Sequence, residues 1–461
     1  MSVPRFAGNY VPKRGASTVK VGIVGAGITG LTLSHYLHER EVDHVVFEAT
    51  DRPGGVIRSE RIDGVTVECG PQRLRLTDPL AEITDAVGIT DDLVFAPDDL
   101  PLYIYADGTL RQVPTDASAF LTTDLLSWRG RARLCVEPLT GPIRDRETAA
   151  EAFIRKFGRE AYRNVIEPLY GGIYGSDPAA MPAEHALTRL RRLEEREGSL
   201  LRPAIRRIFS SDDTAPAAVF KSGMERLPQA LYEANSESIR LETPVRSLRW
   251  AGSGIGADHE SEANDESEPD HTPRSRYVIE TDGGEEEFDQ VVVTADAASS
   301  AELLQNVVHR SEAFATLTYN PLVMIHVRAD HSMDGFGFQV RRDEPLSLLG
   351  ASWNGSTFGR ENLHTCFFGG MHDPELVEAP NEQLTDLVCE EYESIIGVTP
   401  EVINVHRWER GFPAYDRSWA VTDEITLPNG LHLATNYTGG VGIPSRVREA
   451  KLLAEKLSQR T

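Results

Sequence analysis

Residues 19–30 read Val-Lys-Val-Gly-Ile-Val-Gly-Ala-Gly-Ile-Thr-Gly, and they carry the main evidence on fold class. The apolar run up to Val24 predicts a buried strand, and leucines at helical spacing after Gly30 predict a helix. The run from Val42 to Glu48 predicts a second strand. Strand, glycine turn, helix and strand thus fit within about thirty residues, the length of one βαβ unit. The sequence therefore predicts an α/β fold with a Rossmann-like domain.

The turn itself has the Gly-x-Gly-x-x-Gly spacing of a dinucleotide site. The first glycine allows the tight turn, the second lets backbone approach a pyrophosphate, and the third lets the helix pack close to the strand. The helix N-terminus offers free N–H groups to that pyrophosphate, and an acid that closes the second strand can accept bonds from a ribose. The expected contacts are Gly25, Ala26, Gly27, Ile28, Thr29, Gly30 and Glu48. The alternative is a glycine turn in an α/β fold that binds no nucleotide.

A second glycine pair follows the acid, in Arg52-Pro53-Gly54-Gly55. It resembles the second fingerprint of FAD proteins of the amine-oxidase type. Without Cβ atoms, such a pair admits a second close approach of the backbone to the cofactor. A nicotinamide dehydrogenase does not need this element. We therefore expect non-covalent FAD rather than NAD.

Further motifs, in order along the chain, resemble the protoporphyrinogen/coproporphyrinogen oxidase family of flavoproteins. They are Gly54 to Ser59, Glu68 to Pro71, Glu167 to Pro178, Phe220 to Pro228 and Tyr437 to Pro444. The resemblance extends over nearly the whole chain. It implies that the FAD site also includes Arg52, Gly55, Gly70, Pro71, Gln72, Arg73, Val245, Asn436, Val441, Gly442 and Ile443. Thr435 stands where this family usually has glycine, so the local turn is expected to differ.

The resemblance also implies a substrate site. In the family, the porphyrinogen ring lies between a leucine–glycine pair and a large apolar side chain, which match Leu169, Gly172 and Phe367. Phe367 could equally be a core aromatic. Leu102 occupies the place of an arginine that mitochondrial members use for a propionate, and Arg73 and Arg75 are replacement candidates, although both could be ordinary surface arginines. The choice between two propionates and four therefore stays open, and no catalytic side chain is assigned.

We expect the FAD domain to be gathered from residues 19–90, 215–310 and 405–461. A helical substrate domain of membrane type is expected at 91–214, and a substrate-binding sheet domain at 311–404. Residues 251–276 are acidic and poor in apolar side chains, which is typical of a flexible loop.

The 461 residues carry a formal net charge of −24, and only six of the 47 basic residues are lysines. This excess of acids over lysine resembles the proteins of salt-in halophiles; the alternative is an ordinary acidic cytosolic protein. A polyanion is repelled by phosphate backbones, which argues against a nucleic-acid partner. No apolar run is long enough to span a bilayer, and the first 18 residues lack the apolar core of a secretory signal. We expect a cytoplasmic protein with at most loose peripheral membrane contact.

Cys69, Cys135, Cys366 and Cys389 are widely separated, and neither they nor the histidines show metal-ligand spacing. We expect buried, reduced thiols and no metal site.

The resulting hypothesis is an oxygen-dependent FAD enzyme that oxidises protoporphyrinogen IX or coproporphyrinogen III to the porphyrin in haem biosynthesis and releases hydrogen peroxide. One alternative is another flavoenzyme of the same fold, an amine oxidase or a carotenoid desaturase. A second alternative is a non-catalytic tetrapyrrole carrier with a vestigial flavin site.

Overall fold

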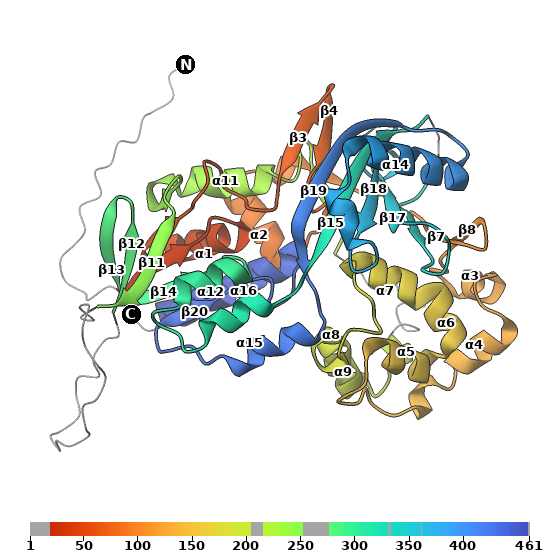
Figure 1. The fold of residues 1–461 in the computed structure, drawn as a ribbon, viewed down its shortest axis with the longest axis horizontal. Helices are drawn as coiled ribbons and strands as arrows, with labels where there is room; N and C mark the ends of the chain where they lie inside the picture. The colour runs from red at the N-terminus through yellow and green to blue at the C-terminus, as the bar shows by residue number, and fades with distance from the viewer. Residues whose placement is uncertain (1–18, 204–214, 252–275, 331–332, 361, 460–461) are drawn as a thin grey trace.

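The structure, a computed structural model, describes residues 19–203, 215–251, 276–330, 333–360 and 362–459. The predictions made for residues 1–18 and for most of the acidic loop lie outside these ranges. Figure 1 shows one lobe around a parallel sheet, a second lobe around a larger, mostly antiparallel sheet, and a group of helices below the second lobe.

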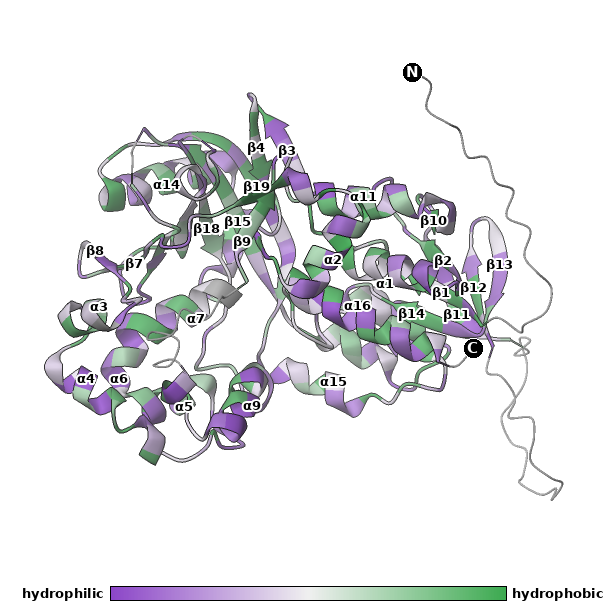
Figure 2. Cartoon of the chain, turned by 180° about the vertical axis from the view of Figure 1, so that it is seen from behind, coloured by the Kyte–Doolittle hydropathy of each residue, from purple (hydrophilic) through white to green (hydrophobic). Residues whose placement is uncertain are grey.

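The first lobe is built on a five-stranded parallel sheet in the order β10-β2-β1-β14-β20. Its strands are β1 (Lys20–Val24), β2 (Asp43–Phe47), β10 (Ile239–Arg240), β14 (Gln290–Val293) and β20 (Leu431–Leu433). Figure 2 shows hydrophobic residues along β14, as expected for a parallel strand covered on both faces. Because these strands come from both ends and the middle of the chain, segments that are far apart in the sequence lie side by side in this sheet.

Side chains alternate between the two faces of this sheet, and each face has its own core. On one face, Ile23 packs with four helices: α1 (Ile28–Glu39), α2 (Asp78–Ala86), α11 (Arg226–Ala234) and α16 (Ile443–Ser458). On the other, Val24 packs with α12 (Ala297–Leu304) and with the antiparallel strands β11 (Val245–Trp250), β12 (Tyr277–Thr281) and β13 (Gly284–Phe288). The sheet is therefore covered on both faces, and the loops at the ends of its strands remain accessible.

The second lobe contains a seven-stranded sheet in the order β19-β15-β18-β17-β16-β7-β8. Its strands are β7 (Leu102–Ala106), β8 (Thr109–Gln112), β15 (Tyr319–Arg328), β16 (Gly337–Val340), β17 (Gly350–Trp353), β18 (Leu363–Gly369) and β19 (Glu401–Pro413). Helix α14 (Asn381–Ile396) covers one face, where Leu384 and Val388 pack on Val323 and Phe368. The opposite face is left for other parts of the chain.

Short strands connect the two lobes. β3 (Ser59–Ile62) and β4 (Val65–Glu68) form a hairpin, and β5 (Leu74–Arg75), β9 (Ala217–Phe220) and β6 (Leu93–Phe95) form a small sheet. Residues 69–73, between β4 and β5, therefore lie at the junction of the lobes.

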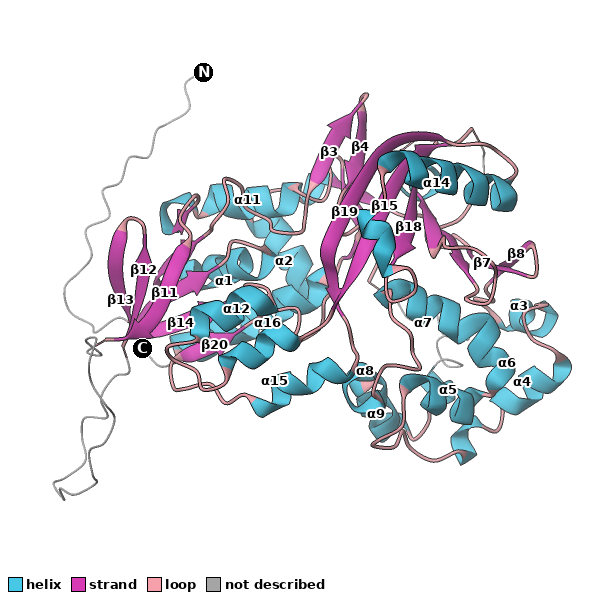
Figure 3. Cartoon of the chain, viewed as in Figure 1, coloured by secondary structure: helices cyan, strands magenta, loops and turns pink. Residues whose placement is uncertain are grey.

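The helical group, seen at the lower right of Figure 3, lies within residues 117–203. It includes α3 (Ala117–Thr122), α4 (Trp128–Leu134), α5 (Ala149–Phe157), α6 (Arg159–Ala161), α7 (Glu167–Tyr174), α8 (Ala183–Ala186) and α9 (Thr188–Glu197). Lys156 is fully buried here between Glu137 and Glu194, and its Nζ lies 3.1 Å from Glu137 Oε1. None of the described helices is long and apolar enough to cross a membrane.

Most predicted elements are present, with two differences. The segment 91–214 contains β7 and β8, which extend the seven-stranded sheet. Residue 405, an expected domain boundary, lies inside β19, a strand of that same sheet.

Candidate cofactor and substrate site

The first glycine turn joins β1 to α1 at the carboxyl end of the parallel sheet. Gly25 has φ +104°, a conformation that favours glycine, and its N–H donates to the Phe47 carbonyl at 2.8 Å. A Cβ on Gly30 would lie 2.0 Å from the Gly25 carbonyl oxygen, whereas a Cβ on Gly27 would meet nothing within 4 Å. Gly30 is thus required by the protein's own packing, and Gly27 leaves open space at the N-terminus of α1.

The second glycine pair lies against the first turn. The Gly54 N–H donates to the Ala26 carbonyl at 2.8 Å, and Gly55, with φ +58°, lies close enough that a Cβ would be 3.4 Å from the Gly27 Cα. Arg52 holds this segment, because its Nη2 donates to the Gly55 carbonyl at 2.6 Å. The structure therefore brings the two glycine motifs together.

Glu48 closes β2 next to the same turn. Its Oε2 accepts the Ala26 N–H at 2.7 Å, and its Oε1 accepts the Thr50 hydroxyl at 2.8 Å. The Thr243 N–H donates to the Glu48 carbonyl at 2.7 Å, so the segment that leads to Val245 runs beside the acid. An acid and a neighbouring backbone segment, the combination expected for an adenosine site, thus lie together at the carboxyl end of the parallel sheet.

Residues 70–73 cross between the lobes. A Cβ on Gly70 would lie 2.0 Å from the Val56 carbonyl oxygen, so the backbone passes close to the segment that follows Gly55. Pro71 follows at a half-buried position. Gln72 donates to the Glu68 carbonyl at 2.8 Å, while its Oε1 is buried and has no hydrogen-bond partner among the described residues. A buried, unpaired acceptor indicates that a donor on a bound group belongs here.

The C-terminal turn approaches the same region. Thr435 does not have positive φ; its Oγ1 instead accepts the Thr438 N–H at 3.2 Å, which explains how threonine replaces the expected glycine. Arg446, buried on α16, donates to the Gly440 carbonyl at 2.7 Å and so fixes this turn. Helix α16 begins at Ile443 with Gly442 as its N-cap, and Asn436 and Val441 lie half-buried on the turn.

The free face of the seven-stranded sheet carries Phe367, the large apolar side chain predicted for the substrate site. Register pairs Phe367 with Met324, and Met324 with His406, so these three side chains form a row on the face opposite α14. Phe367 is half-buried, unlike its fully buried neighbours Cys366 and Phe368. Its side chain is therefore on the open face rather than in the α14 core.

Helix α7 lies over the other end of this face. Leu169 packs against Ile104, and a Cβ on Gly172 would lie 2.0 Å from Gln339 Oε1. The absence of a Cβ at Gly172 thus leaves space that the Gln339 side chain occupies in this structure. A cavity of about 240 Å³ lies beside Gly172, between α7 and the loop after β16.

Arg73 and Arg75 differ in their surroundings. Arg73 has no ion pair or hydrogen bond to any described residue; its guanidinium lies 5.2 Å from the Phe336 ring centre. Burial, and then the positive charge of Arg75, lower the pKa of Arg73 to about 10. Arg75 is exposed and donates to the Ala215 carbonyl at 3.2 Å. Of the two arginines, Arg73 is thus the one without an ion pair or hydrogen bond among the described residues.

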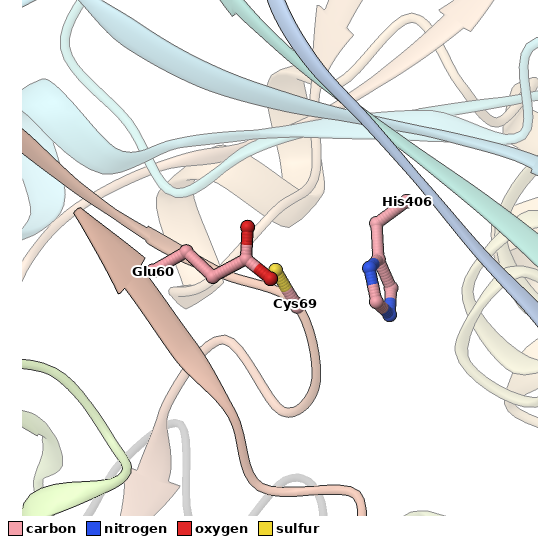
Figure 4. Close-up of side chains that lie close together, drawn as sticks. All are labelled: Glu60, Cys69 and His406. Carbon is pink, nitrogen blue, oxygen red and sulfur yellow. The ribbon is translucent and has the colours of Figure 1, made fainter. Parts of the chain in front are cut away.

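Sequence spacing missed a side-chain cluster at the junction of the lobes. Glu60, Cys69 and His406 bring a carboxylate, a thiol and an imidazole together, with one donor atom of each within 4.8 Å of the others (Figure 4). Burial raises the pKa of Cys69 to about 12. All four cysteines are free, but the prediction that all are buried is wrong for Cys135, which is exposed on the helical group, and for Cys389, which is only half-buried. A local sequence pattern does not reveal this cluster, because His406 is on β19, far along the chain from Glu60 and Cys69.

A model of the flavin-containing amine oxidoreductase family matches residues 28–457. The chain belongs to this family. Protoporphyrinogen oxidase 2 of Arabidopsis thaliana is 26% identical, covering 92% of this chain and 91% of that protein. Coproporphyrinogen III oxidase of Staphylococcus aureus (strain NCTC 8325 / PS 47) is also 26% identical, covering 95% and 99%.

Solved structures agree with this family's fold. A protein of Exiguobacterium sp. 255-15, provisionally assigned as a protoporphyrinogen oxidase, superposes with a TM-score of 0.76 at 25% identity, covering 97% of this chain and all of that one. Putrescine oxidase superposes with a TM-score of 0.70 at 16% identity, covering 96% and 99%, which shows the shared fold.

The family member described here is therefore a flavin-dependent oxidoreductase, and the flavin expected from the sequence is FAD. The residues fit that cofactor. The Gly25–Gly30 turn and the Gly54–Gly55 pair meet at the N-terminus of α1, and Glu48 lies beside them. The unpaired Gln72 oxygen lies in residues 70–73, which pass close to the same region.

Proposed function

We propose that this enzyme oxidises a porphyrinogen to the porphyrin in haem biosynthesis, with molecular oxygen as the final acceptor. The main support is that relatives from a plant and from a bacterium, both matched over more than nine-tenths of this chain, are named as porphyrinogen oxidases. The balance is one porphyrinogen and three O₂ to one porphyrin and three H₂O₂, or six electrons in three two-electron steps.

The proposed FAD contacts are the predicted ones, from Gly25–Gly30 and Glu48 through Arg52, Gly55, 70–73 and Val245 to Asn436 and 441–443. When bound, FAD supplies two-electron redox chemistry, and the protein supplies position and a dry environment. Phe367 and Leu169 would hold a flat apolar ring, for which aromatic and aliphatic walls are suitable. Gly172 would leave space at the ring edge once Gln339 moves aside.

We propose that a substrate propionate pairs with Arg73. The support is its position: a partly desolvated guanidinium, without an acidic partner among the described residues, in a chain that has 71 acidic side chains. A carboxylate would provide the charge-assisted hydrogen bonds that Arg73 does not make within the described chain. Arg75 remains a candidate for a second carboxylate.

The decisive experiment is anaerobic reduction of the purified yellow protein. We expect coproporphyrinogen III or protoporphyrinogen IX to bleach the flavin absorbance, and readmitted oxygen to restore it with release of porphyrin and peroxide. Comparison of the two substrates decides the carboxylate number. Bleaching by a diamine or by a carotene precursor, but by neither porphyrinogen, would assign one of the alternative activities. A colourless protein that binds porphyrin stoichiometrically would assign the carrier.

We further propose that the enzyme is cytoplasmic and touches membranes loosely through the helical group. Leu121, Trp128 and Leu139 are 67%, 70% and 84% exposed on neighbouring elements of this group. Co-flotation with phosphatidylcholine vesicles tests this: Trp128→Ser with Leu139→Ser should abolish binding, whereas Leu452→Ser, at an exposed apolar residue of the other lobe, should not. Equal flotation of all variants would reject the surface.

A further inference from the structure

The cluster of Glu60, Cys69 and His406 is formed by strand register. Glu60 pairs with Val67 across the β3–β4 hairpin, and Cys69 lies two residues beyond Val67, so Glu60 and Cys69 share one face. His406 belongs to β19 and shares its face with Met324. The cluster thus joins the hairpin to the seven-stranded sheet.

The position of Cys69 is fixed on three sides. Its N–H donates to the Arg58 carbonyl at 2.9 Å, Trp408 Nε1 donates to its carbonyl, and the Asn404 amide nitrogen lies 3.9 Å from its sulfur. Because the backbone is held, the Sγ atom is presented to Glu60 and His406 without a large rearrangement. A preorganised donor lowers the cost of binding a ligand.

His406 provides the independent indication that a ligand is missing. Its Nε2 is buried and has no hydrogen-bond partner among the described residues. Buried polar atoms in folded proteins are normally paired, so an unpaired imidazole nitrogen calls for a proton donor or a cation. Glu60 pairs with Arg58 at 2.7 Å through Oε1, which leaves Oε2 for another partner.

We propose that Glu60, Cys69 and His406 bind one Zn²⁺ ion, with water in the fourth position. Thiolate and imidazole donors select zinc over magnesium or calcium. Zinc binds sulfur at about 2.3 Å and nitrogen or oxygen at about 2.0–2.2 Å in tetrahedral geometry. On binding, the Cys69 S–H bond breaks, its proton passes to solvent, and an S–Zn bond forms. One thiolate, one carboxylate and a neutral imidazole then balance the charge of the ion.

This geometry requires little movement. Tetrahedral zinc holds its donor atoms roughly 3.5 Å apart, and the three donors already lie within 4.8 Å. Rotation of the Glu60 and His406 side chains supplies the difference. The bound ion would link Cys69 to β19 of the other lobe. Cys69 directly precedes residues 70–73, the segment proposed to contact the flavin.

The test uses the full-length FAD-loaded protein, freed of metal with a chelator and then dialysed to equilibrium against ZnSO₄. We expect one Zn²⁺ per chain by elemental analysis. Cys69→Ser and His406→Gln should each weaken zinc binding by at least about 100-fold, because loss of a ligand should cost no less affinity than loss of a group that only supports a ligand. The matched control is Cys135→Ser, which removes an exposed thiol far from the cluster and should bind zinc normally.

A second measurement needs no variant. Zinc should raise the melting temperature of the wild-type holoenzyme, because a ligand that binds only the folded state stabilises it, whereas magnesium should not. Zinc binding that is absent, or equal in the wild type and Cys69→Ser, would overturn the proposal, as would a melting temperature that zinc leaves unchanged. Neither readout depends on porphyrinogen turnover, so the metal site can fail while the proposed function stands.

Discussion

Two glycines of the same turn have different physical roles. Gly30 is surrounded by protein, with the Gly25 carbonyl oxygen 2.0 Å from the place of a Cβ, whereas Gly27 borders open space. One glycine therefore serves the fold and the other serves the ligand. Sequence motifs do not separate these roles, but substitutions can.

Gly30→Ala should lower both the melting temperature and the FAD content, because the new methyl group collides with backbone. Gly27→Ala should keep the melting temperature of the FAD-free protein within a few degrees of the wild type and lose FAD affinity, because its methyl group occupies only the cofactor's space. Differential scanning fluorimetry and flavin absorbance measure the two effects. Equal loss of apoprotein stability in both variants would contradict this assignment.

Arg73→Met should raise the KM for the porphyrinogen by about 10-fold or more, the value of one lost charge-assisted hydrogen bond. Because Arg73 has no acidic partner among the described residues, its removal should not lower the melting temperature. Steady-state kinetics compare it with Arg75→Met, for which a smaller rise is expected. Loss of flavin, with KM unchanged in the remaining holoenzyme, would mean that Arg73 contacts the cofactor but not the propionate.

At the scale of elements, the helical group is held by a buried charge cluster. Lys156 of α5 lies between Glu137 and Glu194 of α9, and its Nζ also donates to the Gly141 carbonyl at 3.0 Å. Burial raises the pKa of Glu137, but hydrogen bonds from Ser199 and from the Leu200 N–H outweigh that effect and leave the pKa below its ordinary value. The cluster therefore favours the charged form of Glu137 and connects three separate segments.

Lys156→Met should destabilise this group by about 3–5 kcal/mol, because it leaves two carboxylates buried without their cation. Urea unfolding followed by circular dichroism should show an earlier transition. Lys451→Met removes an ammonium group from a partly exposed pair with Glu82 and should change stability by about 0.5 kcal/mol or less. Similar midpoints for the two variants would mean that the buried cluster contributes little.

At the scale of the whole molecule, the dominant property is the charge of −24. Like charges on one compact body repel each other, and salt screens that repulsion over about 10 Å at 0.1 M and about 3 Å at 1 M. The melting temperature should therefore rise between dilute buffer and molar KCl. Sucrose, which stabilises folded proteins without screening charge, is the control for non-electrostatic stabilisation, and it should raise the melting temperature less than KCl does. A melting temperature that is independent of KCl would reject the halophilic interpretation.

Sequence predicted what is local and missed what depends on long-range pairing. The Gly25–Gly30 turn and Glu48 could be found because one βαβ unit places them. β7 and β8 form a local hairpin, but they were not recognised as part of the larger sheet, since β7 joins it by pairing with Gly337–Val340, which follow the whole helical group in the chain. The contact of Arg73 with Phe336 and the approach of His406 to Cys69 follow from the register of β16 and β19, which no short motif encodes.

The last strand of the parallel sheet, β20, pairs with β14, and α16 packs on α1. Because translation runs from the N-terminus, the first glycine turn is synthesised long before β20 and α16. The nucleotide site therefore lacks one edge of its sheet and one covering helix during much of synthesis. We expect FAD to bind after these two elements have been added.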